Sequence, residues 1–353
     1  MMRKTESWTE KSRAETINRY EGALLGVAVG DALGAPLEFM TAEQIRQKHA
    51  GEVTEMIGGG WLSVEPGEVT DDTQMTLAVA EGIAEGGSNE DKYSFIGENF
   101  LRWYATSPKD IGNTCASVIR KAVDLDLVWQ SEWEAAAEQL WKQTNGGTAG
   151  NGALMRTVYP AIYYKNTFTA QEVAVNIGRM THYHPDSDST VSEYVRAIHI
   201  IANSPEMTIE QAKQTATAGR SEVERVKQKM KGTTAAEPTG WAVDSLLCAY
   251  DAIDKTDSFE DALIYATNLG GDADTIGAIT GGLAGAIYGA EAIPSRWVDA
   301  LNNEPNAKTV RLFEEGYKDT APESLPEGYQ PNILALRLAE LAMIAYKRSH
   351  EKG

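Results

Sequence analysis

The sequence predicts an all-α protein, and its apolar pattern supports this class in three ways. Strict alternation of apolar and polar residues, which marks a half-buried strand, is nearly absent. The most apolar stretch, residues 275–288, is shorter than the ~20 residues of a membrane-spanning helix and predicts a buried helix. Apolar residues recur every three or four positions in residues 72–85, 132–141, 170–180, 189–201 and 332–347. We therefore expect a compact bundle of helices.

Two further helices are expected to carry a stripe of glycines along one face. The glycines recur every fourth residue, at Gly22, Gly26, Gly30 and Gly34, and again at Gly277, Gly281, Gly285 and Gly289. An interior glycine destabilises a helix by about 1 kcal/mol relative to alanine, so close backbone packing must compensate. We expect these two helices to lie centrally and to pack through their glycine faces. Gly34 and Gly289, at the ends, are alternatively helix C-caps.

Composition and charge narrow the class of protein. Among 353 residues, 42% are hydrophobic and 24% are charged, which is typical of a globular chain. The net charge of −19 argues against nucleic acid as a partner and suits cationic partners, arginine-bearing ones included; alternatively it only keeps the protein soluble. Cys115 and Cys248 are too few for a disulfide framework and are expected to be buried thiols.

The N-terminal residues differ in composition from the remainder of the chain, which we expect to fold as one domain. Residues 1–20 are polar and lack the apolar core of a secretory signal, so we expect a cytoplasmic protein that contacts no membrane. We divide the chain into a polar extension, residues 1–19, and a single all-helical domain, residues 20–348. The extension is interpreted as a solvated tail or, alternatively, as a segment that docks onto a partner.

Acidic residues gather at the starts of two expected helices. Residues 68–73 (EVTDDT) follow a glycine-rich turn, and residues 270–275 (GGDADT) lead into the second glycine-striped helix. Either cluster alone has an explanation as a helix N-cap. A helix start needs one cap, however, and four carboxylates near buried helix ends destabilise the fold unless cations neutralise them. Hard oxygen ligands favour Mg²⁺ or Mn²⁺, so we predict a two-cation site.

Five motifs in order resemble the ADP-ribosylglycohydrolase family. They are residues 22–38 (GALLGVAVGDALGAPLE), 70–73 (TDDT), 110–114 (DIGNT), 150–156 (GNGALMR) and 271–275 (GDADT). Together they cover roughly residues 20–300. The resemblance implies a compact orthogonal bundle of helices around a central cleft with two metal ions.

The resemblance also implies ligands for two Mg²⁺ or Mn²⁺ ions. The cations would bind ribose hydroxyls and position water. The implied metal ligands on one side of the site are Thr70, Asp71 and Asp72. Those on the other side are Asp272, Asp274 and Thr275. Of these, Asp274 is also assigned to catalysis.

Two further acidic residues are implied to act at the ribose. Glu38, after the first glycine-striped helix, is similar to a residue beside the substrate in relatives; alternatively it is a surface carboxylate. Asp110 and Asn113 resemble an aspartate and asparagine of the member that reactivates nitrogenase reductase. There the aspartate is thought to help the chemistry, which requires hydrogen-bond reach to the reacting group. The alternative is a simple turn.

A glycine-rich passage is expected to bind the diphosphate. Residues 145–155 offer backbone N–H groups ahead of an apolar run. We also expect His182 near the ligand, although a histidine pair without a third metal ligand is more often structural. The expected substrate-binding residues are Asn113, Gly150, Asn151, Gly152, Met155 and His182.

The function implied by the resemblance is removal of ADP-ribose from modified arginine in an ADP-ribosylated protein. The bond between ribose C1 and a guanidinium nitrogen would break, with carboxylates stabilising an oxocarbenium-like state. One candidate partner is an ADP-ribosyltransferase toxin. This protein would bind the toxin through its N-terminal extension and neutralise it as an immunity factor. Alternatives are a serine or O-acetyl linkage, a non-enzymatic binding protein on the same fold, and a metal-dependent phosphohydrolase.

Overall fold

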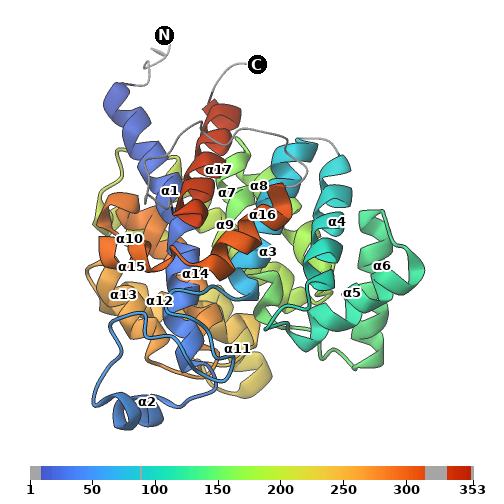
Figure 1. Ribbon diagram of the computed structural model, residues 1–353, viewed down its shortest axis with the longest axis horizontal. Coiled ribbons are helices and arrows are strands. Elements are labelled where there is room, and N and C mark those ends of the chain that lie inside the picture. Colours follow the sequence, from blue (N-terminus) through green and yellow to red (C-terminus); the bar gives the residue numbers. More distant parts are fainter. Residues whose placement is uncertain (1–8, 88–89, 315–331, 351–353) are drawn as a thin grey trace.

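The computed structural model describes residues 9–87, 90–314 and 332–350. Within these ranges the regular structure is helical and no β-strand is formed. The predicted all-α class is therefore confirmed. Figure 1 shows the helices stacked around one long central helix, α1.

The helices follow one another along the chain with short connections. The α-helices are α1 (Glu10–Gly34), α2 (Ala42–His49), α3 (Asp71–Gly86), α4 (Asp91–Ala105), α5 (Asn113–Leu125), α6 (Gln130–Gln143), α7 (Val158–Tyr163), α8 (Thr167–Arg179), α9 (Pro185–Ala202), α10 (Ile209–Ala216), α11 (Arg220–Lys231), α12 (Ala242–Lys255), α13 (Phe259–Thr267), α14 (Ala273–Tyr288), α15 (Ser295–Ala300), α16 (Glu304–Glu314) and α17 (Ile333–His350). Short 3₁₀ turns are η1 (Ala35–Leu37), η2 (Asn151–Ala153) and η3 (Ala290–Ala292).

The helices α1 and α14 pack against each other through their glycine stripes. A Cβ atom added to Gly26 would lie 2.1 Å from the carbonyl oxygen of Gly281, and one added to Gly30 would lie 2.0 Å from that of Gly277. Only hydrogen atoms fit in these gaps, so the two backbones touch. The pairing runs antiparallel, and Figure 1 shows blue α1 beside orange α14 at the centre of the molecule. The predicted central glycine contact is confirmed.

The two end glycines have different roles. Gly289 is the C-cap of α14, with φ of 80° and its N–H donating to the carbonyl of Gly285 at 2.9 Å. Gly34 has the helical φ of −80°, so it does not serve as a left-handed C-cap. A Cβ atom on Gly34 would lie 2.2 Å from the carbonyl oxygen of Ala273, so this glycine extends the contact between α1 and α14.

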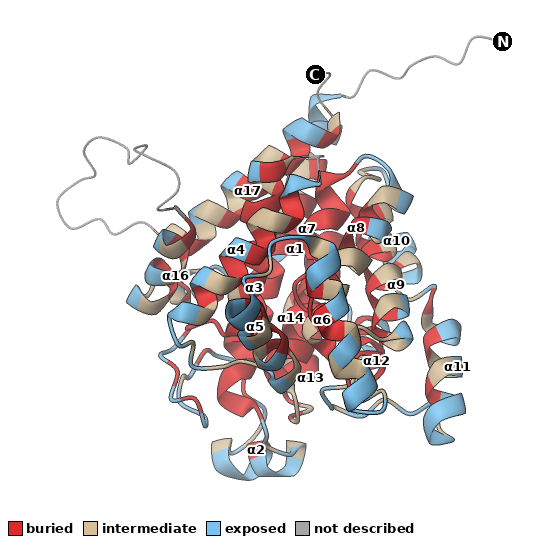
Figure 2. Cartoon of the chain, turned by 90° about the vertical axis from the view of Figure 1, so that its right-hand side faces the viewer, coloured by how far each residue is buried: buried red, intermediate tan, exposed pale blue. Residues whose placement is uncertain are grey.

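A continuous apolar core surrounds this helix pair. Buried residues line the inner faces of the helices, whereas α2 and α11 expose most of their surface (Figure 2). The C-terminal α17 is tied to α3 by Arg337, whose guanidinium donates to both carboxylate oxygens of Glu81 at 2.6 Å. A bidentate, half-buried pair of this kind fixes the angle between the two helices.

The helices expected from apolar periodicity are all found. Residues 72–85 lie in α3, residues 132–141 in α6 and residues 189–201 in α9. Helix α17 begins one residue after the expected segment 332–347 does, and α8 ends one residue before the expected segment 170–180 does. The apolar stretch expected to form a buried helix is α14. None of the helices in the described ranges has the length and hydropathy needed to cross a bilayer.

The boundary expected between residues 19 and 20 falls inside α1. This helix begins at Glu10, and the guanidinium of Arg19 is buried, donating to the carbonyl oxygens of Ile201 at 3.1 Å and Met207 at 2.8 Å. Residues 10–19 are therefore the first turns of the central helix. Residues 1–8 lie outside the described residues, and docking of a partner onto the extension stays a prediction.

The contact between α1 and α14 predicts a severe effect of a single methyl group. In Gly281→Ala the added Cβ would lie 1.9 Å from the carbonyl oxygen of Gly26, so the helices must separate. We expect a loss of at least about 3 kcal/mol in the free energy of unfolding, measured by urea denaturation. Gly112→Ala is the control, because its Cβ meets nothing within 4 Å. Equal stability of the two variants would contradict the prediction.

Candidate functional site

The start of α3 is held by a carboxylate from α1. The side chain of Asp31 accepts hydrogen bonds from the backbone N–H of Thr70 and of Thr73, each at 3.0 Å. It also accepts from the hydroxyls of Thr70 at 2.8 Å and of Thr73 at 2.6 Å. Asp31 is thus the anion at the N-terminus of α3, supplied from another helix. Asp31 was not predicted as a site residue from the sequence, although a lone acidic residue in an apolar glycine-striped segment was the signal.

Helix capping does not account for the acidic residues of the two clusters. The N-cap residues are Thr70 for α3 and Asp272 for α14, and neither makes a capping hydrogen bond with its side chain. Because Asp31 already satisfies the first amides of α3, the carboxylates of Asp71 and Asp72 are not needed there. The capping alternative is therefore wrong for α3.

The two acidic clusters meet at one point. Asp72 Oδ2 accepts hydrogen bonds from the hydroxyl of Thr70 and from the hydroxyl of Thr275, both at 3.3 Å. The other oxygen, Oδ1, is buried and has no hydrogen-bond partner in the described structure. An unpartnered buried carboxylate oxygen destabilises a protein unless a cation binds it, so this atom marks a place where a metal ion fits.

Three carboxylates from different elements form the adjoining acidic group. Glu38 follows η1, Asp110 lies in the loop between α4 and α5, and Asp274 is in the first turn of α14. One oxygen of each lies within 4.8 Å of one oxygen of the others, close enough to share a metal ion. Glu38 and Asp110, expected from the sequence as catalytic residues, thus lie beside the expected ligand Asp274.

Burial raises the pKa of the carboxyl groups in this site. The pKa values of Asp71, Asp72 and Asp274 lie well above the usual range, first because the groups are desolvated and then because neighbouring carboxylates repel further charge. The pKa of Glu38 is raised to about 8 and that of Asp110 is also raised, again chiefly by burial. Because the raised pKa values favour protonation, binding of divalent ions at this site would be coupled to release of protons.

The expected glycine-rich loop is connected to the second acidic cluster. Asn151 donates its side-chain N–H to Asp272 Oδ2 at 2.8 Å and to the hydroxyl of Ser245 at 2.9 Å. Its backbone N–H donates to the carbonyl of Gly240 at 2.9 Å. The amide of Asp272 in turn donates to the carbonyl of Pro238 at 3.2 Å. Two segments therefore hold Asp272, one at its side chain and one at its backbone.

His182 lies behind the glycine loop. A Cβ atom on Gly150 would be 3.1 Å from His182 Nε2, and one on Gly152 would be 2.8 Å from Cε1, so only glycine fits against the ring. His182 Nδ1 is 2.8 Å from the hydroxyl of Thr181. Burial, followed by the charge of Arg156, lowers the pKa of His182 to about 3. The imidazole is neutral and supports the loop; a direct contact with substrate stays a prediction.

The other two expected substrate contacts differ in accessibility. Asn113 is the first residue of α5 and is exposed, next to the loop that carries Asp110. Met155 is buried in the main core, and its N–H donates to the carbonyl of Asn151 at 3.0 Å. Met155 therefore closes the turn of the glycine loop from behind. Substrate binding by Asn113 and by Met155 stays a prediction.

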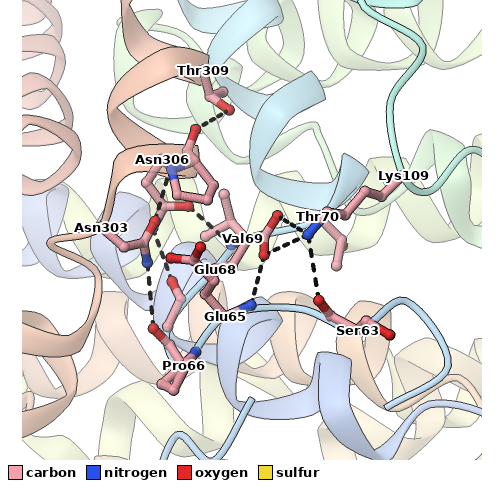
Figure 3. A network of polar contacts seen from close by, with 12 residues as sticks. Ser63, Glu65, Pro66, Glu68, Val69, Thr70, Lys109, Asn303, Asn306 and Thr309 are labelled. Atoms are coloured by element: carbon pink, nitrogen blue, oxygen red, sulfur yellow. Dashed lines mark hydrogen bonds and ion pairs between the residues drawn. The ribbon is translucent and has the colours of Figure 1, made fainter. Parts of the chain in front are cut away.

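A polar network positions the loop that precedes α3 (Figure 3). Lys109, adjacent to Asp110, forms an ion pair with the buried Glu68 at 2.7 Å. On the other side Asn306 of α16 accepts from the N–H of Val69 at 3.1 Å and donates to the carbonyl of Gly67 at 2.9 Å. The network joins the two loops that carry Asp110 and the α3 ligands.

A buried ion pair supports the loop that contacts Asp272 and Asn151. Lys227 of α11 is fully buried and paired with Asp244 of α12. Asp244 also accepts from the hydroxyl of Thr239 at 2.8 Å. The pair thus fixes the loop whose carbonyls at Pro238 and Gly240 hold Asp272 and Asn151. Nothing in the local sequence distinguishes Lys227 from the exposed lysines of α11.

The chain is similar to a known protein family along most of its length. The family model for ADP-ribosylglycohydrolase matches residues 12–329. The chain belongs to the ADP-ribosylglycohydrolase family. The five-motif resemblance is therefore confirmed, and the protein is a hydrolase of this family, acting on ADP-ribosyl linkages.

Individual relatives of this family support the assignment. The chain is 35% identical over 290 residues to the ADP-ribosyl-(dinitrogen reductase) glycohydrolase of Rhodospirillum rubrum, covering 81% of this chain and 90% of that protein. It is 30% identical over 298 residues to the ADP-ribosylarginine hydrolase Tri1 of Serratia proteamaculans, covering 82% and 76%. A solved structure described as an ADP-ribosylglycohydrolase-related protein complex superposes with a TM-score of 0.71 at 27% identity, covering 95% and 99%.

The raised pKa values predict how stability depends on pH and metal. A carboxyl whose folded pKa exceeds its unfolded value binds more protons in the folded state, so its contribution to stability disappears as pH rises through the folded pKa. For Glu38, with a pKa of about 8, chelator-treated protein should lose up to about 1.4 kcal/mol of unfolding free energy per pH unit between roughly pH 6.5 and 8.5. Mg²⁺ should stabilise the protein more at the upper end. Urea denaturation across this range tests both effects.

His182 does not oppose this trend, because its lowered pKa affects stability only below about pH 6.5. Glu38→Gln is the control variant and should reduce the slope of the metal-free profile, leaving the share of the other buried carboxyl groups. Constant stability of the metal-free wild type over this range would contradict the prediction.

The buried pair of Lys227 and Asp244 predicts an asymmetric mutational response. Lys227→Met leaves the Asp244 carboxylate buried and uncompensated, so we expect a loss of about 3–5 kcal/mol in the free energy of unfolding. Adding Asp244→Leu should recover part of the loss. Lys255→Met, which removes an exposed partner of Asp251, should change stability by less than about 1 kcal/mol. Equal unfolding free energies of the two lysine variants in urea would rule out this asymmetry.

Proposed function

We propose that the protein hydrolyses the bond between ribose C1 and an arginine guanidinium nitrogen, releasing ADP-ribose from a mono-ADP-ribosylated protein. Water adds its oxygen to C1, and the departing nitrogen gains a proton. The observation that carries the proposal is the group of buried carboxylates where α3, α14 and the Glu38 and Asp110 loops meet. Such an acidic group stabilises positive charge that develops on the ribose ring.

Two Mg²⁺ or Mn²⁺ ions fit this donor set. The candidate ligands are all hard oxygen donors, and the unpartnered Oδ1 of Asp72 lies among them. The residues that would hold the ions are Thr70, Asp71, Asp72, Asp272, Asp274 and Thr275. When bound, the ions would supply Lewis-acid contacts to the ribose hydroxyls and a water molecule of lowered pKa.

Two residues of the chain are suited to proton transfer at C1. Glu38, with its pKa raised to about 8, would hold a proton near neutral pH when no cation is bound, and the indole N–H of Trp61 fixes its carboxylate at 2.5 Å. Asp110 has a raised pKa and lies on the same acidic group. One carboxyl is positioned to donate a proton to the departing nitrogen and the other to accept one from water.

The remainder of ADP-ribose fits the neighbouring surface. The loop of Gly150 and Gly152 presents backbone N–H groups next to Asp272, which suits a diphosphate. Beyond the loop lies a hollow with a cavity volume of about 440 Å³, lined in part by Gly146 and Trp241. Its aromatic face suits the adenosine end of the substrate.

Arginine is the favoured attachment point on two grounds. Among relatives at 30–35% identity, Tri1 is described as an ADP-ribosylarginine hydrolase. The strongly acidic chain, with a net charge of −19, also attracts the cationic guanidinium that an arginine linkage presents.

A product analysis tests the proposal. The wild type, Asp274→Asn and the control Asp124→Asn, an exposed aspartate of α5, are incubated with an arginine-ADP-ribosylated protein in Mg²⁺ and then in chelator. We expect the wild type and the control to release intact ADP-ribose only with Mg²⁺, and Asp274→Asn to lose at least about a hundredfold in rate. Mass spectrometry follows adduct and product.

Other products would support the alternatives. Parallel reactions contain a serine-ADP-ribosylated peptide and O-acetyl-ADP-ribose. Release from one of these substrates alone would change the linkage, and release of phosphate or a nucleotide would indicate a phosphohydrolase. No release under any condition would indicate a binding protein.

A further inference from the structure

Two aromatic side chains stand exposed beside the acidic group. Phe39 is 68% exposed and Trp61 is 54% exposed, and their ring centroids lie 5.3 Å apart. Phe39 follows Glu38 directly, and Trp61 donates its indole N–H to Glu38 Oε2. An outward-facing aromatic pair therefore adjoins a carboxylate that takes part in the acidic group.

The backbone holds Phe39 in a strained conformation. Its φ is 62°, in the left-handed region that bulky residues rarely adopt. The Phe39 N–H donates to the carbonyl of Gly271 at 2.7 Å, and the Gly271 N–H donates to the carbonyl of Met40 at 2.7 Å. Phe39 is thus fixed to the turn that carries Asp272. Strain that the surrounding structure imposes on an exposed residue points to a functional role.

Packing does not explain Trp61 either. Its loop is closed by paired hydrogen bonds between Gly59 and Val64, at 2.7 and 2.9 Å. Leu62 and Val64 are buried against Ala35 and anchor the loop to the core. Trp61 is left outside this small cluster, so most of its ring area contributes nothing to apolar burial.

We propose that Phe39 and Trp61 form the subsite for the guanidinium of the modified arginine, and so contribute to the choice of linkage. This inference rests on the proposed function. The group leaving ribose C1 must lie between the acidic group and solvent, where these rings stand. A planar cation stacks favourably on aromatic faces, and the hydrogen bond from Trp61 to Glu38 holds this ring beside the acidic group. Serine and acetyl groups offer no such cation.

The test compares two molecules: a substrate that carries the arginine leaving group, and ADP-ribose, which lacks it. Steady-state kinetics of the full chain are measured on an arginine-ADP-ribosylated peptide, with free ADP-ribose as competitive inhibitor. Phe39→Leu removes the aromatic face but keeps an apolar side chain, and should lower kcat/KM about tenfold. The inhibition constant of ADP-ribose should stay at the wild-type value, because ADP-ribose has no guanidinium.

Two companion variants separate the aromatic effect from others. Phe39→Tyr keeps the ring and should restore kcat/KM. Phe168→Leu makes the same change at a 72% exposed phenylalanine of α8 and should have no effect.

The possible outcomes distinguish the two proposals. The subsite is rejected if Phe39→Leu retains wild-type kcat/KM, or if the inhibition constant of ADP-ribose rises by the same factor. If the wild type itself releases no ADP-ribose from the peptide, the proposed function fails, and the subsite fails with it.

Discussion

The contact between the glycine faces of α1 and α14 determines where the site can form. Because the helices are antiparallel and touch at Gly26 with Gly281 and at Gly30 with Gly277, their register is fixed to within a residue. The end of α1 then meets the start of α14, which brings Glu38 beside Asp274. A wider spacing would leave these carboxylates on separate surfaces. The unfavourable helix propensity of glycine is thus offset by a contact that assembles the site.

A second layer of polar contacts holds the acidic residues in place against their mutual repulsion. Asp31 binds the first amides of α3, Asn151 binds Asp272, and the buried Lys227–Asp244 pair fixes the loop behind them. Each of these contacts joins segments far apart in the chain. The site is therefore preorganised by the fold rather than by any one motif, as metal and catalytic sites generally require.

The molecule changes in chemical character from the core outwards across this site. Neutral His182 and the carboxyl groups of Asp72 and Asp274 are buried, the glycines of the loop are partly buried, and the ring of Phe39 is exposed at the surface. The family assignment and the group of carboxylates both support hydrolysis of an ADP-ribosyl linkage.

The sequence alone predicted the helices with clear apolar periodicity, because apolar spacing depends on neighbours along the chain. It also predicted the glycine contact, because only close packing compensates a glycine stripe. It also indicated Asp72 and Asp274, since one helix start does not need several carboxylates. Only the tertiary structure decided that Asp31 binds the start of α3, that His182 lies behind the loop and that Lys227 is buried. These roles depend on which distant segments cover a side chain, and local spacing carries no information about that.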